Sequence, residues 1–210
     1  MSDSLVFVRT FDAPPFSQKE YLRYMGCPNA DGAVLELAES VLTEAQPLLH
    51  YRVCWRELPM ECTGGTVVID RVSVQSRHLA KALTGCSRVL LFGATLGIEL
   101  DRLIAKYSRT APSRAVALQA LGAERVEALC DAFVAEQTKG YQASGVSLRP
   151  RFSPGYGDLS LELQRKLFEW LDCARKIGLS LNDSLLMSPT KSVTAVVGLC
   201  EERPVIKESL

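Results

Sequence analysis

Charged and aromatic side chains stand at fixed spacing in a rigid stretch, residues 149–158, which we call the motif loop. Its sequence, Arg149-Pro-Arg-Phe-Ser-Pro-Gly-Tyr-Gly-Asp158, has two prolines and two glycines in ten residues, a composition that fixes an irregular turn. The guanidinium of Arg151 can form two parallel hydrogen bonds with a carboxylate. The ring of Tyr156 has flat apolar faces and a polar tip. Such a loop suits a small-molecule site; alternatively, it is a structural turn whose tyrosine packs on the core.

A helix is predicted directly after the motif loop, so we expect Asp158 or Ser160 to cap its N-terminus. A second strand-to-helix connection is Gly93-Ala-Thr-Leu-Gly97. Backbone N–H groups at a helix start can bind an anion, but this stretch lacks the spacing of a dinucleotide-binding motif and the Lys-Ser/Thr pair of a P-loop. We favour a tight turn there, with Thr95 as the N-cap of the helix.

Seven cysteines and two histidines offer little for metal binding or nucleophilic catalysis. No two cysteines form a Cys-x-x-Cys pair, whereas zinc sites and disulfide frameworks prefer close, paired spacing. We therefore expect reduced, mostly buried thiols and no metal. The Gly-x-Ser-x-Gly turn that presents a nucleophile is absent, and we assign no catalytic role to His50 or His78.

The composition is that of an ordinary globular protein. The 210 residues include 24 Lys or Arg and 24 Asp or Glu, so the formal net charge is zero. A nucleic-acid-binding protein needs a basic surplus to release counterions from phosphates, and we expect no nucleic acid partner. The longest nearly apolar run, 89–98, has about half of the roughly 20 residues of a membrane-spanning helix. The N-terminus lacks a signal-peptide pattern. We expect a cytoplasmic protein without membrane contacts.

Apolar periodicity predicts helices and strands that are interleaved without a regular βαβ repeat. Helices are predicted after a capping box at Ser17–Glu20 and over about 32–46, 76–84, 98–107, 113–137 and 160–177. Strands are predicted at about 51–55, 66–69, 88–92, 184–187 and 192–199, with an extended segment at 146–151. The fold class is therefore α+β: a single domain, 1–210, with a central, largely antiparallel twisted sheet flanked by helices. Residues 1–50 are expected to form a helical N-terminal cap and residues 51–200 the core, with a frayed tail from Glu201.

The motif loop also resembles part of a known family. Arg151-Phe-Ser-Pro-Gly-Tyr156 is similar to the Arg-x-x-x-Gly-Tyr motif of the activation domain of vitamin B12-dependent methionine synthase. Three further segments resemble that domain in their order and separation: Ala94–Gly97, Ala123–Asp131 and Leu186–Thr194. The resemblance covers most of residues 20–200 and implies a stand-alone homologue of that domain.

The resemblance implies a module that binds S-adenosylmethionine and docks onto a cobalamin-carrying protein. In the family, inactive cob(II)alamin is restored by one-electron reduction from a flavodoxin-like donor, coupled to methyl transfer from S-adenosylmethionine. The protein itself positions the reactants. This sequence contains no Asp-x-His-x-x-Gly cobalamin signature. We therefore expect it to act on a separate corrinoid protein, most simply a methionine synthase without its own activation domain.

The resemblance also assigns roles to individual residues. Arg151 matches the arginine that binds the ligand carboxylate, and Tyr156 matches the tyrosine that faces the corrin, which makes it the catalytic residue. Glu127 or Asp131 is expected to pair with the ligand ammonium, and the alignment does not choose between them. On the strand expected to line the adenosine, the family has aromatic residues where this chain has none. The residues assigned to cofactor binding are Arg151, Ser153, Gly155, Tyr156, Glu127, Asp131, Val197 and Gly198.

Two other functions are compatible with this sequence. One is a non-catalytic binding module that docks onto another corrinoid methyltransferase or takes a different small ligand. The other is a structural partner that clamps a cobalamin domain without binding S-adenosylmethionine. The presence of Arg151 favours a ligand-binding module over a clamp.

Overall fold

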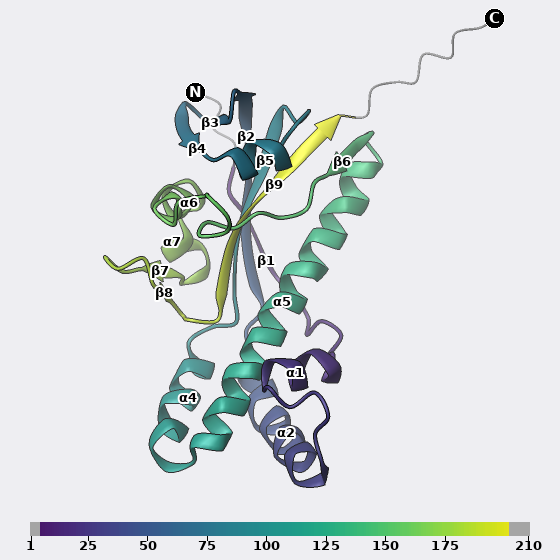
Figure 1. The fold of residues 1–210 in the computed structure, drawn as a ribbon, viewed down its shortest axis with the longest axis vertical. Helices are drawn as coiled ribbons and strands as arrows, with labels where there is room; N and C mark the ends of the chain where they lie inside the picture. Colours follow the sequence, from purple (N-terminus) through teal and green to yellow (C-terminus); the bar gives the residue numbers. More distant parts are fainter. Residues whose placement is uncertain (1–4, 202–210) are drawn as a thin grey trace, which may run out of the picture.

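Strands from the whole length of the chain meet in one antiparallel sheet, in a computed structural model that describes residues 5–201 (Figure 1). The strand order is β4-β3-β2-β5-β9-β6, and β1 pairs with β2 beside this path. The strands are β1 Phe7–Thr10, β2 Arg52–Thr63, β3 Thr66–Ile69, β4 Val72–Gln75, β5 Arg88–Thr95, β6 Val146–Leu148 and β9 Ser192–Glu201. All of their pairings are antiparallel, which confirms the predicted α+β fold class.

Helices cover both faces of the sheet. The long helix α5 packs on one face and, in Figure 1, extends below it among α1, α2 and α4, whereas α6 and α7 lie on the other face. The helices are α1 Gln18–Tyr24, α2 Gly32–Ala45, α3 Arg77–Ala82, α4 Glu99–Thr110, α5 Pro112–Gln142, α6 Leu163–Leu171 and α7 Cys173–Ile177. Within residues 5–201, no helix combines the length and apolar character needed to cross a bilayer.

The central strands are buried on both faces, because helices cover both sides of the sheet. Successive side chains of a strand point to opposite sides. In β5, Leu90 and Phe92 belong to the apolar cluster under α5, whereas Val89 and Leu91 belong to the cluster under α6 and α7. A strand that is covered on both faces reads as a continuous apolar run rather than an alternating one. This is the reason that the strand at 88–92 could be predicted from its sequence.

Helix α5 continues through Gly122, which the periodicity treated as an interruption. A Cβ atom at this position would lie 2.7 Å from Leu100 Cδ2 and 2.7 Å from Lys191 Cγ. The glycine therefore allows α4 and the turn before β9 to approach the helix closely. A residue that weakens helical propensity is here required for packing.

The predicted helix at 160–177 is wrong as a single element, because Asp172 adopts a left-handed conformation with φ +50° and separates α6 from α7. The predicted strand at 184–187 is also wrong. Leu185 has φ +63°, and the side chain of Asn182 accepts a hydrogen bond from the Leu186 N–H at 2.9 Å. This turn delays the strand to β8, Met187–Ser188, which pairs with β7, Ser180–Leu181, in a separate two-stranded sheet.

The expectations for the N-terminal region and for Thr95 need similar correction. Residues 1–50 contain β1 as well as α1 and α2, so the expected helical cap also supplies a strand to the sheet. Thr95 is not an N-cap: it ends β5, and its hydroxyl accepts hydrogen bonds from Gly97 N–H and from Ser192 Oγ. The capping residue Ser17 is confirmed, since its Oγ accepts from Glu20 N–H at 3.3 Å. The tail after Glu201 lies outside the described residues.

The cysteines are not all unpaired thiols as expected. Cys86, after α3, and Cys200, near the end of β9, form a disulfide across 114 residues of sequence. Close spacing could not reveal this bond, because the fold alone brings the two residues together. Cys54 and Cys173 are buried thiols with their sulfur atoms 3.9 Å apart. Among residues 5–201 there is no cluster of three or more His, Cys, Asp or Glu side chains suited to a metal ion.

Candidate functional site

The motif loop follows the exposed edge of β9 after β6 ends. Arg149 N–H donates to the Gly198 carbonyl at 2.9 Å, and Phe152 exchanges two backbone hydrogen bonds with Val196 at 2.8 and 2.9 Å. These bonds hold the loop against the sheet on both sides of Arg151. The position of its guanidinium is therefore set by a β-strand and not by a free loop.

The side chain of Arg151 reaches α5, where it meets both acidic candidates. Its Nη2 donates to Glu127 Oε2 at 2.5 Å and to Asp131 Oδ1 at 3.1 Å. The two carboxylates lie one helical turn apart, so they share one face of α5. Burial opposes the charge of Arg151, but the hydrogen bond to Glu127 and the nearby negative charges outweigh it and raise the pKa of the guanidinium.

Both hydrogen bonds come from one nitrogen of Arg151. A guanidinium has five N–H donors, and the structure of residues 5–201 shows no partner for those on Nε and Nη1. These N–H groups can therefore donate to a ligand while Glu127 and Asp131 keep the side chain in place. Each of these acids has an oxygen left for a cation. The three residues together suit a molecule that carries a carboxylate beside an ammonium.

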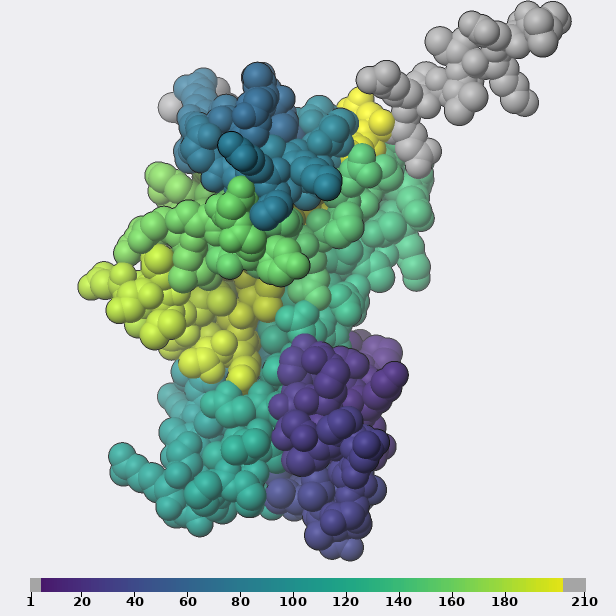
Figure 2. Space-filling model, in the orientation of Figure 1, coloured from purple at the N-terminus to yellow at the C-terminus, as the bar shows by residue number. Residues whose placement is uncertain are grey.

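A groove of about 570 Å³ lies beside the two acids, between α5 and the segment that leads into α1. Figure 2 shows this N-terminal part, in purple, lying against the teal surface of α5. The groove is lined by Pro14, Pro15, Ser17, Glu20, Tyr24, Glu124, Glu127, Ala128, Asp131, Ala132 and Ala135. The carboxylates of the groove favour a cationic group. Its small side chains leave room for an extended ligand to lie along α5.

A buried ion pair fixes the wall of this groove. Glu124 and Arg125 are each 3% exposed and bond to each other. Arg125 donates to the carbonyls of Pro14 and Pro15 at 2.7 and 2.8 Å, and Ser17 N–H donates to Glu124 Oε1 at 2.9 Å. Sequence analysis missed this pair and the role of 14–17. Two adjacent opposite charges within a mostly apolar stretch of a predicted helix were the available signal.

The end of the motif loop turns Tyr156 outward. Tyr156 N–H donates to the Ser153 carbonyl at 3.2 Å, and Gly155, with φ +86°, donates to the Leu159 carbonyl at 2.9 Å. This conformation favours glycine because other residues rarely adopt it. Tyr156 is 70% exposed, and its ring packs edge-on against Phe152 with 5.5 Å between centroids. The tyrosine therefore stands on the surface and does not pack in the core.

The two candidates on β9 are placed differently from the others. Val197 has no exposed surface and lies in the apolar cluster under α5. Gly198 is also buried, and a Cβ atom there would lie 2.7 Å from Cys86 Sγ. The structure thus brings Arg151 together with Glu127 and Asp131, but it puts the side chain of Val197 in the core.

Asp158 does not cap the helix that follows the motif loop. Its carboxylate accepts hydrogen bonds from Ser76 Oγ and from the N–H groups of Arg77 and His78, at the start of α3. The hydrogen bond from Ser76 is the largest influence that lowers the pKa of Asp158. Ser160 Oγ accepts from the N–H of residue 162 at 3.2 Å, just before α6. The motif loop is consequently tied to α3.

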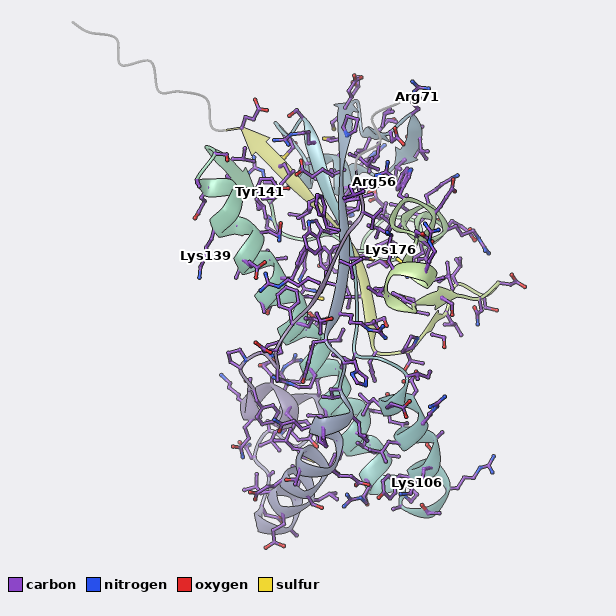
Figure 3. All side chains as sticks on the ribbon, turned by 180° about the vertical axis from the view of Figure 1, so that it is seen from behind. Arg56, Arg71, Lys106, Lys139, Tyr141 and Lys176 are labelled. Atoms are coloured by element: carbon purple, nitrogen blue, oxygen red, sulfur yellow. A yellow bond between two sulfur atoms is a disulfide. The ribbon has the colours of Figure 1, made fainter. Side chains whose placement is uncertain are left out.

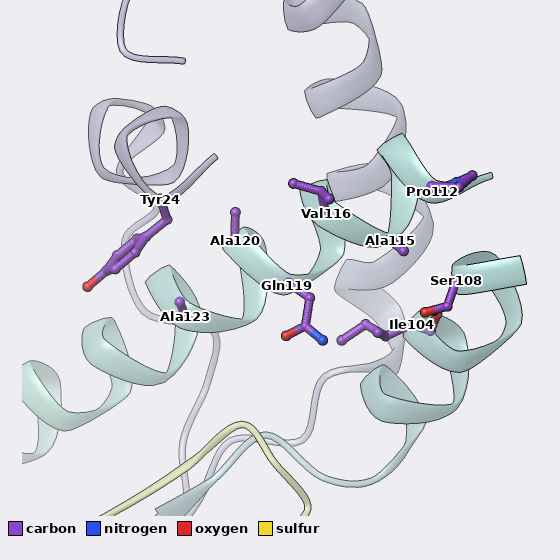
Figure 4. Close-up of a pocket in the computed structure, with 9 residues that line it drawn as sticks. All are labelled: Tyr24, Ile104, Ser108, Pro112, Ala115, Val116, Gln119, Ala120 and Ala123. Carbon is purple, nitrogen blue, oxygen red and sulfur yellow. The ribbon is translucent and has the colours of Figure 1, made fainter. Parts of the chain in front are cut away.

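A second hollow, of about 450 Å³, lies between α1, α4 and α5 (Figure 4). It is lined by Tyr24, Ile104, Ser108, Pro112, Ala115, Val116, Gln119, Ala120 and Ala123. None of these side chains is charged. The hollow therefore offers apolar surface and a few hydrogen bonds but no group for acid, base or ionic chemistry.

Comparisons with known proteins support the fold. No family model matches the sequence, and no curated protein matches it either. Several solved structures do match. One is the crystal structure of the MetH reactivation domain bound to AdoHcy, with a TM-score of 0.70 and 15% identity over 92% of this chain and 78% of that chain. At this level of identity the likeness concerns the fold, and it agrees with the α+β architecture predicted from the sequence.

Proposed function

We propose that this chain is an S-adenosylmethionine-binding reactivation module that acts on a corrinoid carried by a separate protein. The observation that carries the proposal is the contact of Arg151 with both Glu127 and Asp131 at the edge of a groove. The fold likeness adds support, because the matched domain was solved with AdoHcy, the demethylated form of the same ligand.

The amino-acid end of S-adenosylmethionine is a carboxylate beside an ammonium, which matches these charges. Arg151 would bind the carboxylate through an N–H group left free on Nη1 or Nε, since hydrogen bonds between charged groups are stronger than neutral ones. Glu127 and Asp131 would hold the ammonium and, at the same time, orient Arg151. The backbone of Ser153 and Gly155 would border the ligand. Val197 and Gly198 are buried, so no contact with the adenosine is assigned to them.

The partner's corrinoid supplies the redox and nucleophilic chemistry: one-electron reduction of cob(II)alamin, followed by capture of the methyl group of S-adenosylmethionine. This chain would hold the methyl donor by its amino-acid end and present it at the docked surface. Tyr156, exposed in the same loop as Arg151, would fill space at that surface and exclude water. No proton transfer is assigned to it.

The partner of this reaction is expected to be a methionine synthase that lacks its own activation domain, served by a flavodoxin-like electron donor in the cytoplasm. Docking onto another corrinoid methyltransferase is the nearest alternative. Both partners require the same ligand site, so ligand binding is tested first.

The test is equilibrium dialysis of the purified chain against radiolabelled S-adenosylmethionine, with unlabelled S-adenosylhomocysteine as competitor. Saturable binding of S-adenosylmethionine would support the proposal if methionine alone is only a weak competitor. Absence of binding at millimolar ligand, for a protein shown to be folded by circular dichroism, would exclude it. A clamp that recognises only a corrinoid protein would then be the better description.

A further inference from the structure

A third hollow, distinct from the groove, lies between α3 and the motif loop. It has a volume of about 620 Å³. The charged, imidazole and aromatic side chains that line it are His78, Lys81, Arg149, Phe152 and Tyr156. Figure 2 shows the blue-to-teal region that contains α3 lying against the green segment that contains the loop. No residue lines both this hollow and the groove.

The hollow presents hydrogen-bond donors and no free carboxylate. The ammonium of Lys81 has no hydrogen-bond or ion-pair partner anywhere in residues 5–201. Arg149 makes a single side-chain hydrogen bond, from Nη2 to the Thr84 carbonyl at 3.1 Å. The neighbouring acid, Asp158, already accepts three hydrogen bonds from the start of α3. Within the described residues, neither Lys81 nor Arg149 therefore has an ion-pair partner.

His78 adds a third donor, because of how its ring is held. Its Nδ1 accepts a hydrogen bond from Asp158 N–H at 3.3 Å. In a neutral imidazole the proton must then lie on Nε2, which becomes a donor. The Cβ position of Gly157 is 2.5 Å from Nδ1 of His78, so the loop backbone lies directly against the ring and fixes its orientation.

Arg149 is also held in place, since its side chain packs across β9. The Cβ position of Gly198 is 3.1 Å from Arg149 Cγ. The aliphatic part of the side chain thus lies on the strand, while the guanidinium reaches the Thr84 carbonyl just after α3. A charge that is positioned before the ligand arrives loses less conformational entropy on binding.

The other wall is aromatic. Phe152 is half-buried against the core and holds the exposed ring of Tyr156 in an edge-on contact, with an interplanar angle of 81°. Tyr156 as a whole residue is 70% exposed, and an exposed aromatic ring is a surface on which a planar ring can stack. Cations and an aromatic face in one hollow are complementary to a planar ring that carries an oxyanion.

We infer that the hollow between α3 and the motif loop is a binding site for a nucleoside monophosphate, with the phosphate on Lys81 and Arg149 and the base on Tyr156. This site goes beyond the proposed S-adenosylmethionine site and does not depend on it. Tyr156 is the one residue that the two proposals share, so the test depends on Lys81 and Arg149.

The test uses adenosine 5′-monophosphate as the probe, in ¹H–¹⁵N NMR titrations of the chain saturated with S-adenosylhomocysteine. Adenosine and inorganic phosphate are titrated separately as the two halves of the probe. We expect the monophosphate to shift the amides of Lys81, Arg149 and Gly157, and to bind at least about tenfold more tightly than either half. The double variant Lys81→Gln/Arg149→Gln should weaken binding by about tenfold or more.

The matched control is Lys106→Gln, which removes a lysine from α4. Figure 3 shows Lys106 at the opposite end of the molecule from Arg71, which lies between β3 and β4. This variant should leave the affinity unchanged. Equal affinity for phosphate alone would overturn the assignment of the aromatic wall. No binding at 10 mM probe, roughly the weakest affinity of interest, or an unchanged affinity in the folded double variant, would overturn the site.

Discussion

Asp158 and His78 exchange two hydrogen bonds: the carboxylate of Asp158 accepts from His78 N–H at 3.2 Å, and Asp158 N–H donates to Nδ1 of His78 at 3.3 Å. The two residues are 80 positions apart in the sequence. Their contact attaches the end of the motif loop to α3, while backbone bonds to β9 hold its beginning. The loop that carries Arg151 and Tyr156 is therefore fixed at both ends.

The first prediction concerns Asp158→Asn and pH. The pKa of Asp158 is lowered in the folded protein, chiefly by the hydrogen bond from Ser76. The ionised group therefore stabilises the fold above its unfolded pKa of about 3.9, and this stabilisation is lost as the pH falls through the lower, folded pKa. We expect the variant to unfold at lower urea concentration near pH 7, and the difference to shrink below about pH 4. A difference that is constant from pH 7 to pH 3 would contradict this account.

The second prediction concerns the ligand contact of Arg151. Arg151→Leu removes a charge-assisted interaction worth about 1.5–3 kcal/mol, so the Kd for S-adenosylmethionine should rise about 10- to 100-fold. The measurement is equilibrium dialysis. Arg165→Leu is the control, because Arg165 is an exposed arginine on α6 that pairs with a carboxylate in its own helical region. Equal affinities of the two variants would remove Arg151 from the site.

The third prediction concerns Tyr156 and separates its hydroxyl from its ring. Tyr156→Phe should be nearly silent, because the proposed role is to occupy space. Tyr156→Ala should slow reactivation of a cob(II)alamin partner by about tenfold, which corresponds to about 1.4 kcal/mol of barrier, with little change in S-adenosylmethionine affinity. The assay is the recovery of methylcobalamin absorbance with a reductant supplied. If the phenylalanine variant were as slow as the alanine variant, the hydroxyl would have a role of its own.

The fourth prediction concerns the buried pair of Glu124 and Arg125. Arg125→Met leaves the carboxylate of Glu124 buried without its partner, which should lower the free energy of unfolding by about 3–5 kcal/mol. Adding Glu124→Gln removes the uncompensated charge, so the double variant should recover part of this loss. Urea unfolding monitored by circular dichroism gives both values. A double variant less stable than Arg125→Met would show that the charge of Glu124 is stabilised by other groups.

Much of the fold could be predicted from local patterns, because its main elements bury large apolar surfaces. The strand at 88–92 is a continuous apolar run, and α5 follows the helical period over most of its length. The four-residue strands β1 and β4 were missed. They are short, and their place in the sheet depends on pairing with a neighbour rather than on periodicity of their own.

The candidate site, like the fold, could be predicted from local sequence only in part. The rigid turn before Tyr156 follows from proline and glycine positions that are adjacent in sequence. By contrast, the contact of Arg151 with both Glu127 and Asp131 requires residues 20 and 24 positions apart to meet, and the resemblance suggested the acids only as alternatives. The carbonyl partners of Arg125 are more than a hundred residues away, so no local pattern identifies them.

The close packing at Gly122 has a consequence for the site itself. Helix α5 is unbroken from Pro112 to Gln142, and Glu127 lies five residues, or about 7.5 Å of helical rise, beyond the glycine. Any change that pushes α4 or the turn before β9 away from Gly122 would therefore tilt the same rod that carries Glu127, while Arg151 stays with the sheet. Mutations that touch no residue of the groove would therefore change the distance between Glu127 and Arg151.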